Sequence, residues 1–213
     1  LKAKRLIEAC PVIALPQSGK GEGVAYAIAR QVCPGLDEKQ QLRLDMPMTR
    51  DQERLHKSHQ EGAQAIARQL DQGNDVAFLT LGDPTIYSTY VYLHQRVVEM
   101  GYEAQMVPGV PSFCAAAARL GISLTEGAQP LCVIPASYPG VTEALEGKGT
   151  KVLMKTGRSM EKVKELLKEK GLYENAKMVE KCGMEGETLY DTLDQADNES
   201  SYFSLIIAKE EEV

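Results

Sequence analysis

The chain has 213 residues, of which 43% are hydrophobic and 25% are charged, and its formal net charge is -6. This composition supports a substantial buried core, in one large domain or two smaller ones, and argues against a disordered chain. The acidic balance argues against a protein that binds nucleic acid over its whole surface, because such domains are usually basic.

The cysteine pattern indicates the redox state of the cellular compartment and whether the protein binds a metal. Five cysteines, Cys10, Cys33, Cys114, Cys132 and Cys182, form no C-x-x-C pair and no regular spacing with histidine. Neither a zinc site nor a disulfide framework is indicated, so we expect reduced thiols and no protein-bound metal. No apolar run approaches the length of a membrane span, and the start does not resemble a signal peptide. We therefore expect a soluble, cytoplasmic protein with neither a membrane nor a nucleic acid as partner.

Apolar runs and helical periodicity alternate through the first half of the chain. Residues 1–7 have the pattern of the middle of an amphipathic helix, so we expect an N-terminal piece to precede them. Strands are predicted over 12–15, 42–46 and 75–81, and helices over 22–32, 50–70 and 86–100. The alternation predicts an α/β fold with a mainly parallel sheet. One face of the helix over 50–70 carries Leu55, Ala63, Ile66, Ala67 and Leu70.

Residues 107–112 contain two prolines and one glycine and read as a semi-rigid connector. We predict the domain boundary there, with an N-terminal domain over 1–108 and a C-terminal domain over 109–213. In the second half, helices are predicted over 113–120 and 159–170, and strands over 131–135, 151–155, 177–181 and 202–208. The last strands lack a clear long helix between them, which predicts antiparallel members in a mixed second sheet.

The junction after the strand over 75–81 is the most informative feature of the sequence. Gly82, Asp83 and Pro84 end the strand at once and expose backbone amides and one carboxylate at its carboxyl end. Open α/β sheets bind ligands at such ends, and glycine lets a flat ligand approach the main chain closely. The structural alternative is a turn aspartate that only caps the following helix.

The segment 82–89, Gly-Asp-Pro-Thr-Ile-Tyr-Ser-Thr, is followed at 107–113 by Val-Pro-Gly-Val-Pro-Ser-Phe and an alanine-rich helix. Together these segments resemble the tetrapyrrole methylase family. The Tyr-Ser-Thr extension is similar to the branch that methylates carbon 20 of precorrin-2 or of cobalt-factor II, in cobalamin biosynthesis. The resemblance implies two α/β lobes, with S-adenosylmethionine in a cleft between them, and a homodimer. The family's opening strand and Gly-Pro-Gly-Asp-Pro loop are not present in this sequence.

The resemblance also implies which residues contact the methyl donor. Each segment has a structural alternative: a plain hinge at 107–113, core filling by the methionine, and an inert buried thiol at Cys182. Pro111 stands where many members have a small hydroxyl residue, so any hydroxyl contact at that point is lost. The implied donor contacts are Gly82, Asp83, Ile86, Ser112, Phe113, Met154, Cys182 and Gly183.

Candidate substrate contacts come from the basic residues near the start of the helix over 50–70. Such a run is usually a solvated surface with local ion pairs. A tetrapyrrole with many carboxylates nevertheless needs a local positive patch on an acidic protein. The candidates are Arg43, Arg50, Arg54 and Lys57, together with Ser88 and Thr89 at the pocket's edge.

The expected chemistry requires no nucleophile from the protein, because the sulfonium is already a strong electrophile and the attacked bridging carbon is electron-rich. Positioning can then carry much of the catalysis. A proton must leave after methyl transfer, and three residues at strand ends are candidates to accept it or to stabilise the change in charge. These are Asp83, Tyr87 and Lys155, and Lys155 is also a candidate for binding substrate carboxylates.

Two other classes of function remain open. Gly19-Lys20-Gly21 suggests a phosphate loop, but the Walker spacing is absent, so we expect a flexible loop that covers the tetrapyrrole site. The first alternative is a methyltransferase of the same fold that acts on another tetrapyrrole position or on a macromolecule, such as ribosomal RNA or a modified protein histidine. The second is a non-catalytic nucleotide-binding module built around the Gly-Lys-Gly segment.

Overall fold

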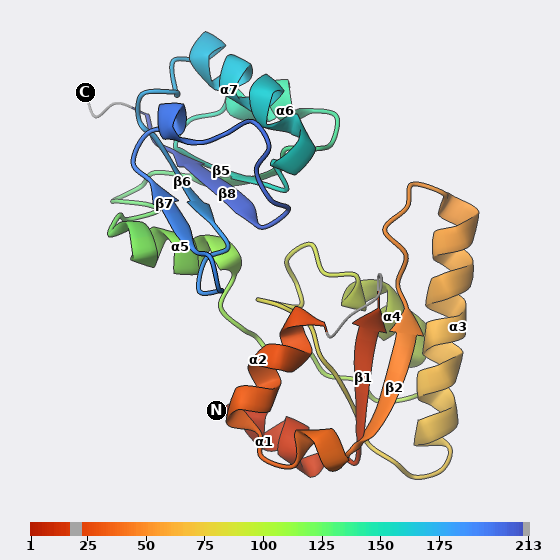
Figure 1. Cartoon of the computed structure of the whole chain (residues 1–213). Coiled ribbons are helices and arrows are strands. Elements are labelled where there is room, and N and C mark those ends of the chain that lie inside the picture. Colours follow the sequence, from red (N-terminus) through yellow and green to blue (C-terminus); the bar gives the residue numbers. More distant parts are fainter. Residues whose placement is uncertain (18–22, 211–213) are drawn as a thin grey trace. The chain divides into compact units, whose positions relative to one another are not determined.

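The protein, described here as a computed structural model, forms two compact units, Leu1–Val110 and Pro111–Val213 (Figure 1). The structure describes residues 1–17 and 23–210. The division lies within the predicted proline-rich connector, just after the boundary expected at residue 108. The Gly-Lys-Gly segment and the start of the helix predicted from residue 22 lie outside the described residues.

The first unit contains a parallel sheet of three strands in the order β2-β1-β3. Parallel neighbours need a crossover connection, and here helices provide it, as the strand–helix alternation predicted. The strands are β1 (Val12–Gln17), β2 (Gln40–Asp45) and β3 (Val76–Phe78). The helices are α1 (Lys2–Ala9), α2 (Val24–Val32), α3 (Gln52–Leu70) and α4 (Tyr90–Glu99), with a 3₁₀ turn at Leu36–Glu38.

The central strand β1 is covered on both faces, which explains its continuous apolar sequence. Ile13 packs in a cluster with Tyr26 and Ala29 of α2, whereas Ala14 packs with residues of α3 and α4. Figure 1 shows α2 and α3 on opposite sides of the sheet. The buried residues of the second cluster are Ala14, Leu44, Met46, Ala63, Ile66, Leu93 and Val97.

Two predicted elements of this unit are wrong in their extent. β3 ends at Phe78 instead of residue 81, and α4 begins at Tyr90 instead of residue 86. The intervening residues form turns, because Pro84 interrupts the backbone and Tyr87 adopts a left-handed conformation with φ of 49°. The predicted apolar face of α3 is also incomplete, since Ser58 and His59 are buried as well.

The second unit contains a mixed sheet of five strands in the order β4-β5-β8-β6-β7. β4 and β5 are parallel, and the other neighbouring pairs are antiparallel, which confirms the expected mixed sheet. The strands are β4 (Leu131–Pro135), β5 (Thr150–Met154), β6 (Ala176–Glu180), β7 (Thr188–Tyr190) and β8 (Ser204–Ala208). The helices are α5 (Ser112–Leu120), α6 (Val141–Leu145) and α7 (Met160–Glu169), with 3₁₀ turns at Gly157–Ser159 and Leu193–Gln195.

Every residue of β8 is buried, and its neighbours β5 and β6 are nearly so. Figure 1 shows α5 on one face of this sheet and α6 and α7 on the other. The sequence analysis missed α6 and β7. Their five and three residues are too short to show a helical or a strand period.

A glycine at the entry to β5 supports a prediction about stability. Gly149 has φ of +87°, and a Cβ there would lie 2.1 Å from the carbonyl oxygen of Pro130. Gly171, at φ of +68°, has no atom within 4 Å of the same position and is the matched control. We expect Gly171→Ala to lower the free energy of unfolding by about 1 kcal/mol, from backbone strain alone. Gly149→Ala should lower it by at least about 2 kcal/mol more, measured by urea denaturation. Equal losses would contradict this packing.

Candidate functional site

The loop after β3 is organised by the carboxylate of Asp83. Its Oδ1 accepts hydrogen bonds from the backbone N–H of Thr85 at 2.8 Å and from the Thr85 hydroxyl at 2.5 Å. Its Oδ2 accepts one from the backbone N–H of Gly109 at 3.0 Å. Both oxygens are therefore engaged, and the side chain joins the loop to the connector that ends the first unit.

The same contacts set the charge of this carboxylate. The hydrogen bonds from the Thr85 hydroxyl and the Thr85 amide, and then the one from Gly109, lower the pKa of Asp83 below its ordinary value of 3.8. Each of these donors favours the ionised form. Asp83 is thus an anion at neutral pH, with a lower affinity for a proton than an ordinary aspartate.

Two glycines let the loop and the connector come together. Gly82 has φ of +66°, and a Cβ on Gly109 would lie 2.1 Å from the carbonyl oxygen of Gly82. Only a residue without a side chain fits at 109, so main chain lies directly against main chain here. The expected donor contacts Gly82, Asp83 and Ile86 thus belong to one braced turn, in which the Ile86 N–H also bonds the Asp83 carbonyl at 3.2 Å.

The Tyr-Ser-Thr extension lies between this turn and α4. Tyr87 is 48% exposed, whereas the Ser88 hydroxyl lies 3.0 Å from the Thr80 hydroxyl and accepts the Tyr90 N–H at 3.3 Å. Thr89 is exposed and precedes the first residue of α4. Ser88 therefore contributes to the start of the helix, while Tyr87 and Thr89 are accessible.

A pocket of about 560 Å³ lies at the carboxyl ends of β1 and β2. It contains two of the four basic residues expected to bind substrate, Arg43 and Arg54. Arg50 and Lys57 are not among its lining residues, and Lys57 forms an ion pair with Glu61 at 3.9 Å. The lining residues are Gln17, Arg43, Asp45, Pro47, Met48, Thr49 and Arg54.

The carboxyl end of β5 carries Met154 and Lys155 in the second unit. Both are partly buried, and Lys155 has a left-handed φ of 58°. The Lys155 ammonium lies 5.9 Å from the centre of the Tyr138 ring. Tyr202 and Phe203 precede β8, the antiparallel neighbour of β5, and their rings meet edge to face at 5.4 Å. The sequence analysis placed both residues in the strand over 202–208, whereas β8 begins only at Ser204.

The residues expected at the start of α5 differ in accessibility. Ser112 is exposed, whereas Phe113 is 7% exposed, so its side chain is chiefly part of the core. Pro111 precedes the helix and no side chain caps its first turn. Ser112 is thus accessible at the start of a helix whose first turn has no side-chain cap.

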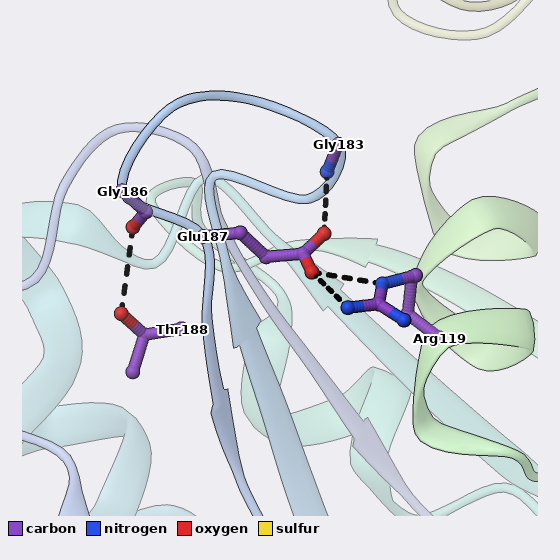
Figure 2. Close-up of polar contacts among 5 residues, drawn as sticks. All are labelled: Arg119, Gly183, Gly186, Glu187 and Thr188. Carbon is purple, nitrogen blue, oxygen red and sulfur yellow. Dashed lines mark hydrogen bonds and ion pairs between the residues drawn. The ribbon is translucent and has the colours of Figure 1, made fainter.

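The loop between β6 and β7 contains Cys182 and Gly183. The Gly183 N–H donates to Glu187 Oε2 at 2.6 Å, and Glu187 Oε1 accepts from Arg119 Nε at 2.8 Å and from Arg119 Nη2 (Figure 2). Burial, followed by the Glu187 carboxylate, raises the pKa of the Cys182 thiol, so the thiol is neutral at pH 7. No motif points to Arg119 or Glu187, which lie far apart along the chain.

The structure therefore gathers the predicted residues into separate groups. The first unit holds the braced turn at Gly82–Ile86 and the pocket with Arg43 and Arg54.

Within residues 1–17 and 23–210, no cluster of three or more His, Cys, Asp or Glu side chains could hold a metal ion. Over the same residues, no helix combines the length and apolarity that crossing a bilayer requires.

Comparison with known proteins places this geometry in a family. The profile of the tetrapyrrole (corrin/porphyrin) methylases matches residues 1–197. The cobalt-precorrin-2 C(20)-methyltransferase of Salmonella typhimurium is 30% identical over 217 residues, which cover 99% of this chain and 90% of that protein. The cobalamin biosynthesis protein CobIJ of Mycobacterium tuberculosis is 33% identical over 96% of this chain, which spans only 42% of its length.

A solved structure shares the fold. A cobalamin biosynthetic enzyme, cobalt precorrin-4 methyltransferase, superposes with a TM-score of 0.75 at 20% identity, over 98% of this chain and 87% of that one. The matching profile extends through both units and includes the Gly82–Thr89 loop, the Pro111–Phe113 segment and the loop at Cys182. The chain therefore belongs to the tetrapyrrole (corrin/porphyrin) methylase family.

Proposed function

We propose that the chain transfers a methyl group from S-adenosylmethionine to carbon 20 of precorrin-2 or cobalt-factor II, in cobalamin biosynthesis. The observation that carries the proposal is the braced turn Gly82–Ile86, which follows β3 of the parallel sheet shortly after the strand ends at Phe78, on the side where α/β folds bind ligands. The similarity to the Salmonella C(20)-methyltransferase over 99% of the chain supports the choice of substrate. From the resemblance we also propose a cytoplasmic homodimer.

The methyl donor fits the residues that the structure presents. Gly82 carries no side chain, and the accessible main chain around it allows close approach of a planar group. The ionised Asp83 is suited to a ligand that carries a positive charge or hydroxyl groups. We propose Gly82, Asp83, Ile86, Ser112, Phe113, Met154, Cys182 and Gly183 as the donor contacts.

The bound donor supplies an electrophilic methyl group on a sulfonium, so the protein's main task is alignment. Of the three catalytic candidates, Asp83 suits charge stabilisation better than proton acceptance, because its hydrogen bonds lower its pKa. The methylated ring carries positive charge until its proton leaves, and an ionised carboxylate stabilises that charge. Tyr87 and Lys155 remain our candidates for contacting the ring, with Lys155 also binding its carboxylates. Cobalt, where present, arrives within the substrate.

The pocket with Arg43 and Arg54 suits the acidic rim of a tetrapyrrole. The pocket lining has two guanidinium groups and one carboxylate, that of Asp45, so the charged side chains of the lining sum to a positive charge on a chain whose net charge is -6. Guanidinium groups bind carboxylates through paired hydrogen bonds. We propose Arg43 and Arg54 as the main substrate-binding residues of the first unit, with Arg50, Lys57, Ser88 and Thr89 in lesser roles.

The reaction is tested with donor labelled in its methyl group. We expect purified protein to transfer the label to precorrin-2 or cobalt-factor II, and NMR of the product to place the new methyl group on carbon 20. A new methyl group on another carbon would establish the alternative of a different tetrapyrrole position. Binding of a nucleoside triphosphate without binding of S-adenosylhomocysteine, measured by calorimetry, would instead support the nucleotide-binding alternative.

The role of Asp83 gives a second prediction. Asp83→Asn replaces one carboxylate oxygen, which accepts hydrogen bonds, with an amide NH₂, which cannot accept them. The turn therefore loses at least one hydrogen bond. We expect about tenfold weaker binding of S-adenosylhomocysteine, measured by calorimetry. The control is Asp71→Asn, which alters an exposed carboxylate bonded to the Tyr102 hydroxyl in the same unit. Equal affinities of the two variants would remove Asp83 from the donor site.

The lowered pKa of Asp83 also fixes a pH dependence. A group whose pKa is depressed by folding contributes stability above its unfolded value, here near 3.8, and loses it as the pH falls through the folded value. Donor binding that depends on Asp83 should therefore be constant between about pH 6 and 8 and weaken only in acid. The Asp83→Asn variant should lack this acid-dependent loss.

The arginine pocket gives a third prediction. Arg43→Gln and Arg54→Gln should each raise the KM for the tetrapyrrole by about tenfold, because each removes a charged partner for a carboxylate. Binding of S-adenosylhomocysteine should be unchanged. Arg50→Gln and Lys57→Gln should have a smaller effect, since neither residue lines the pocket. Arg68→Gln, in the last turn of α3, is the control. An equal rise in KM for Arg68→Gln would indicate only a long-range charge effect.

A further inference from the structure

The loop between β6 and β7 is attached to the end of α5 through a single carboxylate. Glu187 accepts two hydrogen bonds from the Arg119 guanidinium through Oε1 and one from the Gly183 N–H through Oε2 (Figure 2). The Glu187 side chain is 17% exposed, whereas that of Arg119 is 55% exposed. The carboxylate is thus the inner member of the pair and touches both segments.

The loop is conformationally demanding by itself. Lys181 has a left-handed φ of 52°, which is unfavourable for a residue with a side chain, and Gly183 has φ of 70°. Two tight turns follow, in which Met184 N–H bonds the Lys181 carbonyl at 2.9 Å and Glu187 N–H bonds the Met184 carbonyl at 3.1 Å. A loop of this kind needs contacts from outside to hold one conformation.

We propose that Arg119 and Glu187 are positioning residues for the methyl donor, an inference that rests on the proposed function. The two segments that this pair joins both carry proposed donor contacts: Ser112 and Phe113 begin α5, and Cys182 and Gly183 lie in the loop. Glu187 fixes the main chain at Gly183, and Arg119 fixes Glu187 against the helix. Neither side chain contacts the donor in this scheme. The pair acts by holding the main chain of the β6–β7 loop at a fixed position relative to α5.

The electrostatics of the pair suit a permanent brace. The Arg119 hydrogen bonds, and then the Gly183 N–H, lower the pKa of Glu187, so the carboxylate stays ionised at neutral pH. Its charge is offset by the guanidinium, which makes the hydrogen bonds charge-assisted on both sides. The brace therefore operates over the whole physiological pH range.

The second unit offers a matched control for an ordinary surface ion pair. Lys209 Nζ lies 2.9 Å from Glu126 Oε1, and this pair also joins segments far apart in the sequence. One side chain of each pair is 55% exposed, Glu126 here and Arg119 in the other pair, so the two ion pairs are matched in exposure. Glu126→Gln removes the same charge as Glu187→Gln within the same unit, and Glu126 lies outside both proposed donor segments.

The experiment measures S-adenosylhomocysteine binding by calorimetry for the full chain and for Glu187→Gln, Arg119→Gln, the double variant and Glu126→Gln. We expect Glu187→Gln to weaken binding about tenfold, and Glu126→Gln to change it less than twofold. The double variant should bind like Glu187→Gln alone, because Arg119 acts through Glu187. Arg119→Lys, which keeps the charge but not the fork of donors, should lie between wild type and Arg119→Gln.

Two further readouts separate positioning from a general loss of structure. Amide hydrogen exchange over residues 182–187 should accelerate in Glu187→Gln but not in Glu126→Gln, while the thermal midpoints of the two variants stay alike. In the methyl-transfer assay, Glu187→Gln should raise the KM for the donor with little change in kcat at saturating donor.

The outcomes are distinct. If wild type binds S-adenosylhomocysteine and Glu187→Gln binds it equally well, the positioning role is refuted while the proposed function stands. Weaker binding by Glu187→Gln without faster exchange of the loop also refutes it, because the effect would not pass through the loop. If wild type shows no binding, the proposed function fails and the inference fails with it.

Discussion

The structure depends most on carboxylates that join a loop to a segment far away in the sequence. Asp83 Oδ2 accepts from the Gly109 N–H, while its Oδ1 accepts from Thr85 within the loop. Glu187 Oε1 accepts from Arg119 of α5, while its Oε2 accepts from the Gly183 N–H within the loop. Glycine is needed at the donor residue 109, because a Cβ there would collide with the Gly82 carbonyl. Both units thus use an acidic side chain to hold a loop that has no regular secondary structure.

This arrangement suits a reaction in which the donor carries its own reactivity. A sulfonium needs no activation by the protein, so rate depends on how closely the loops are held in the reactive geometry. Loops are the most mobile parts of a fold, and the braced turn and the β6–β7 loop both compensate with charged hydrogen bonds. The lowered pKa values of Asp83 and Glu187 follow from the same bonds that hold the loops.

Much of the fold was predictable because its strands have strong local signals. The bounds of β4 were predicted without error, and those of β1, β2, β5 and β6 within about two residues, which is the usual spread. The extent of β3 and the start of α4 were wrong, because the apolar run through Leu81 continues past the last paired residue. Hydrogen-bond pairing, which a periodicity does not reveal, decides where a strand ends.

The candidate site was predictable only where its residues form a local motif. Gly82 and Asp83 adjoin in sequence. The helix-capping alternative for Asp83 is wrong, because Asp83 accepts the Thr85 amide within the loop, whereas α4 begins only at Tyr90. The hydrogen bond that Asp83 accepts from the Gly109 N–H was not predicted. Arg43 and Arg54 were expected from charge alone, yet composition could not separate them from Arg50 and Lys57, which do not line the pocket. The Arg119–Glu187 pair joins residues 68 positions apart, and neither belongs to a motif.

The two braces differ in charge, and the difference has a consequence for a cationic donor. Glu187 is offset by Arg119, so the β6–β7 loop gains little net potential from the pair. Asp83 is satisfied by two amides and a hydroxyl, which are neutral, so its negative charge is retained at the turn. Under the proposed function this charge attracts the sulfonium of the donor, whereas the product S-adenosylhomocysteine has a neutral sulfur. The electrostatic attraction at Asp83 therefore weakens once the methyl group has left, which favours exchange of product for fresh donor.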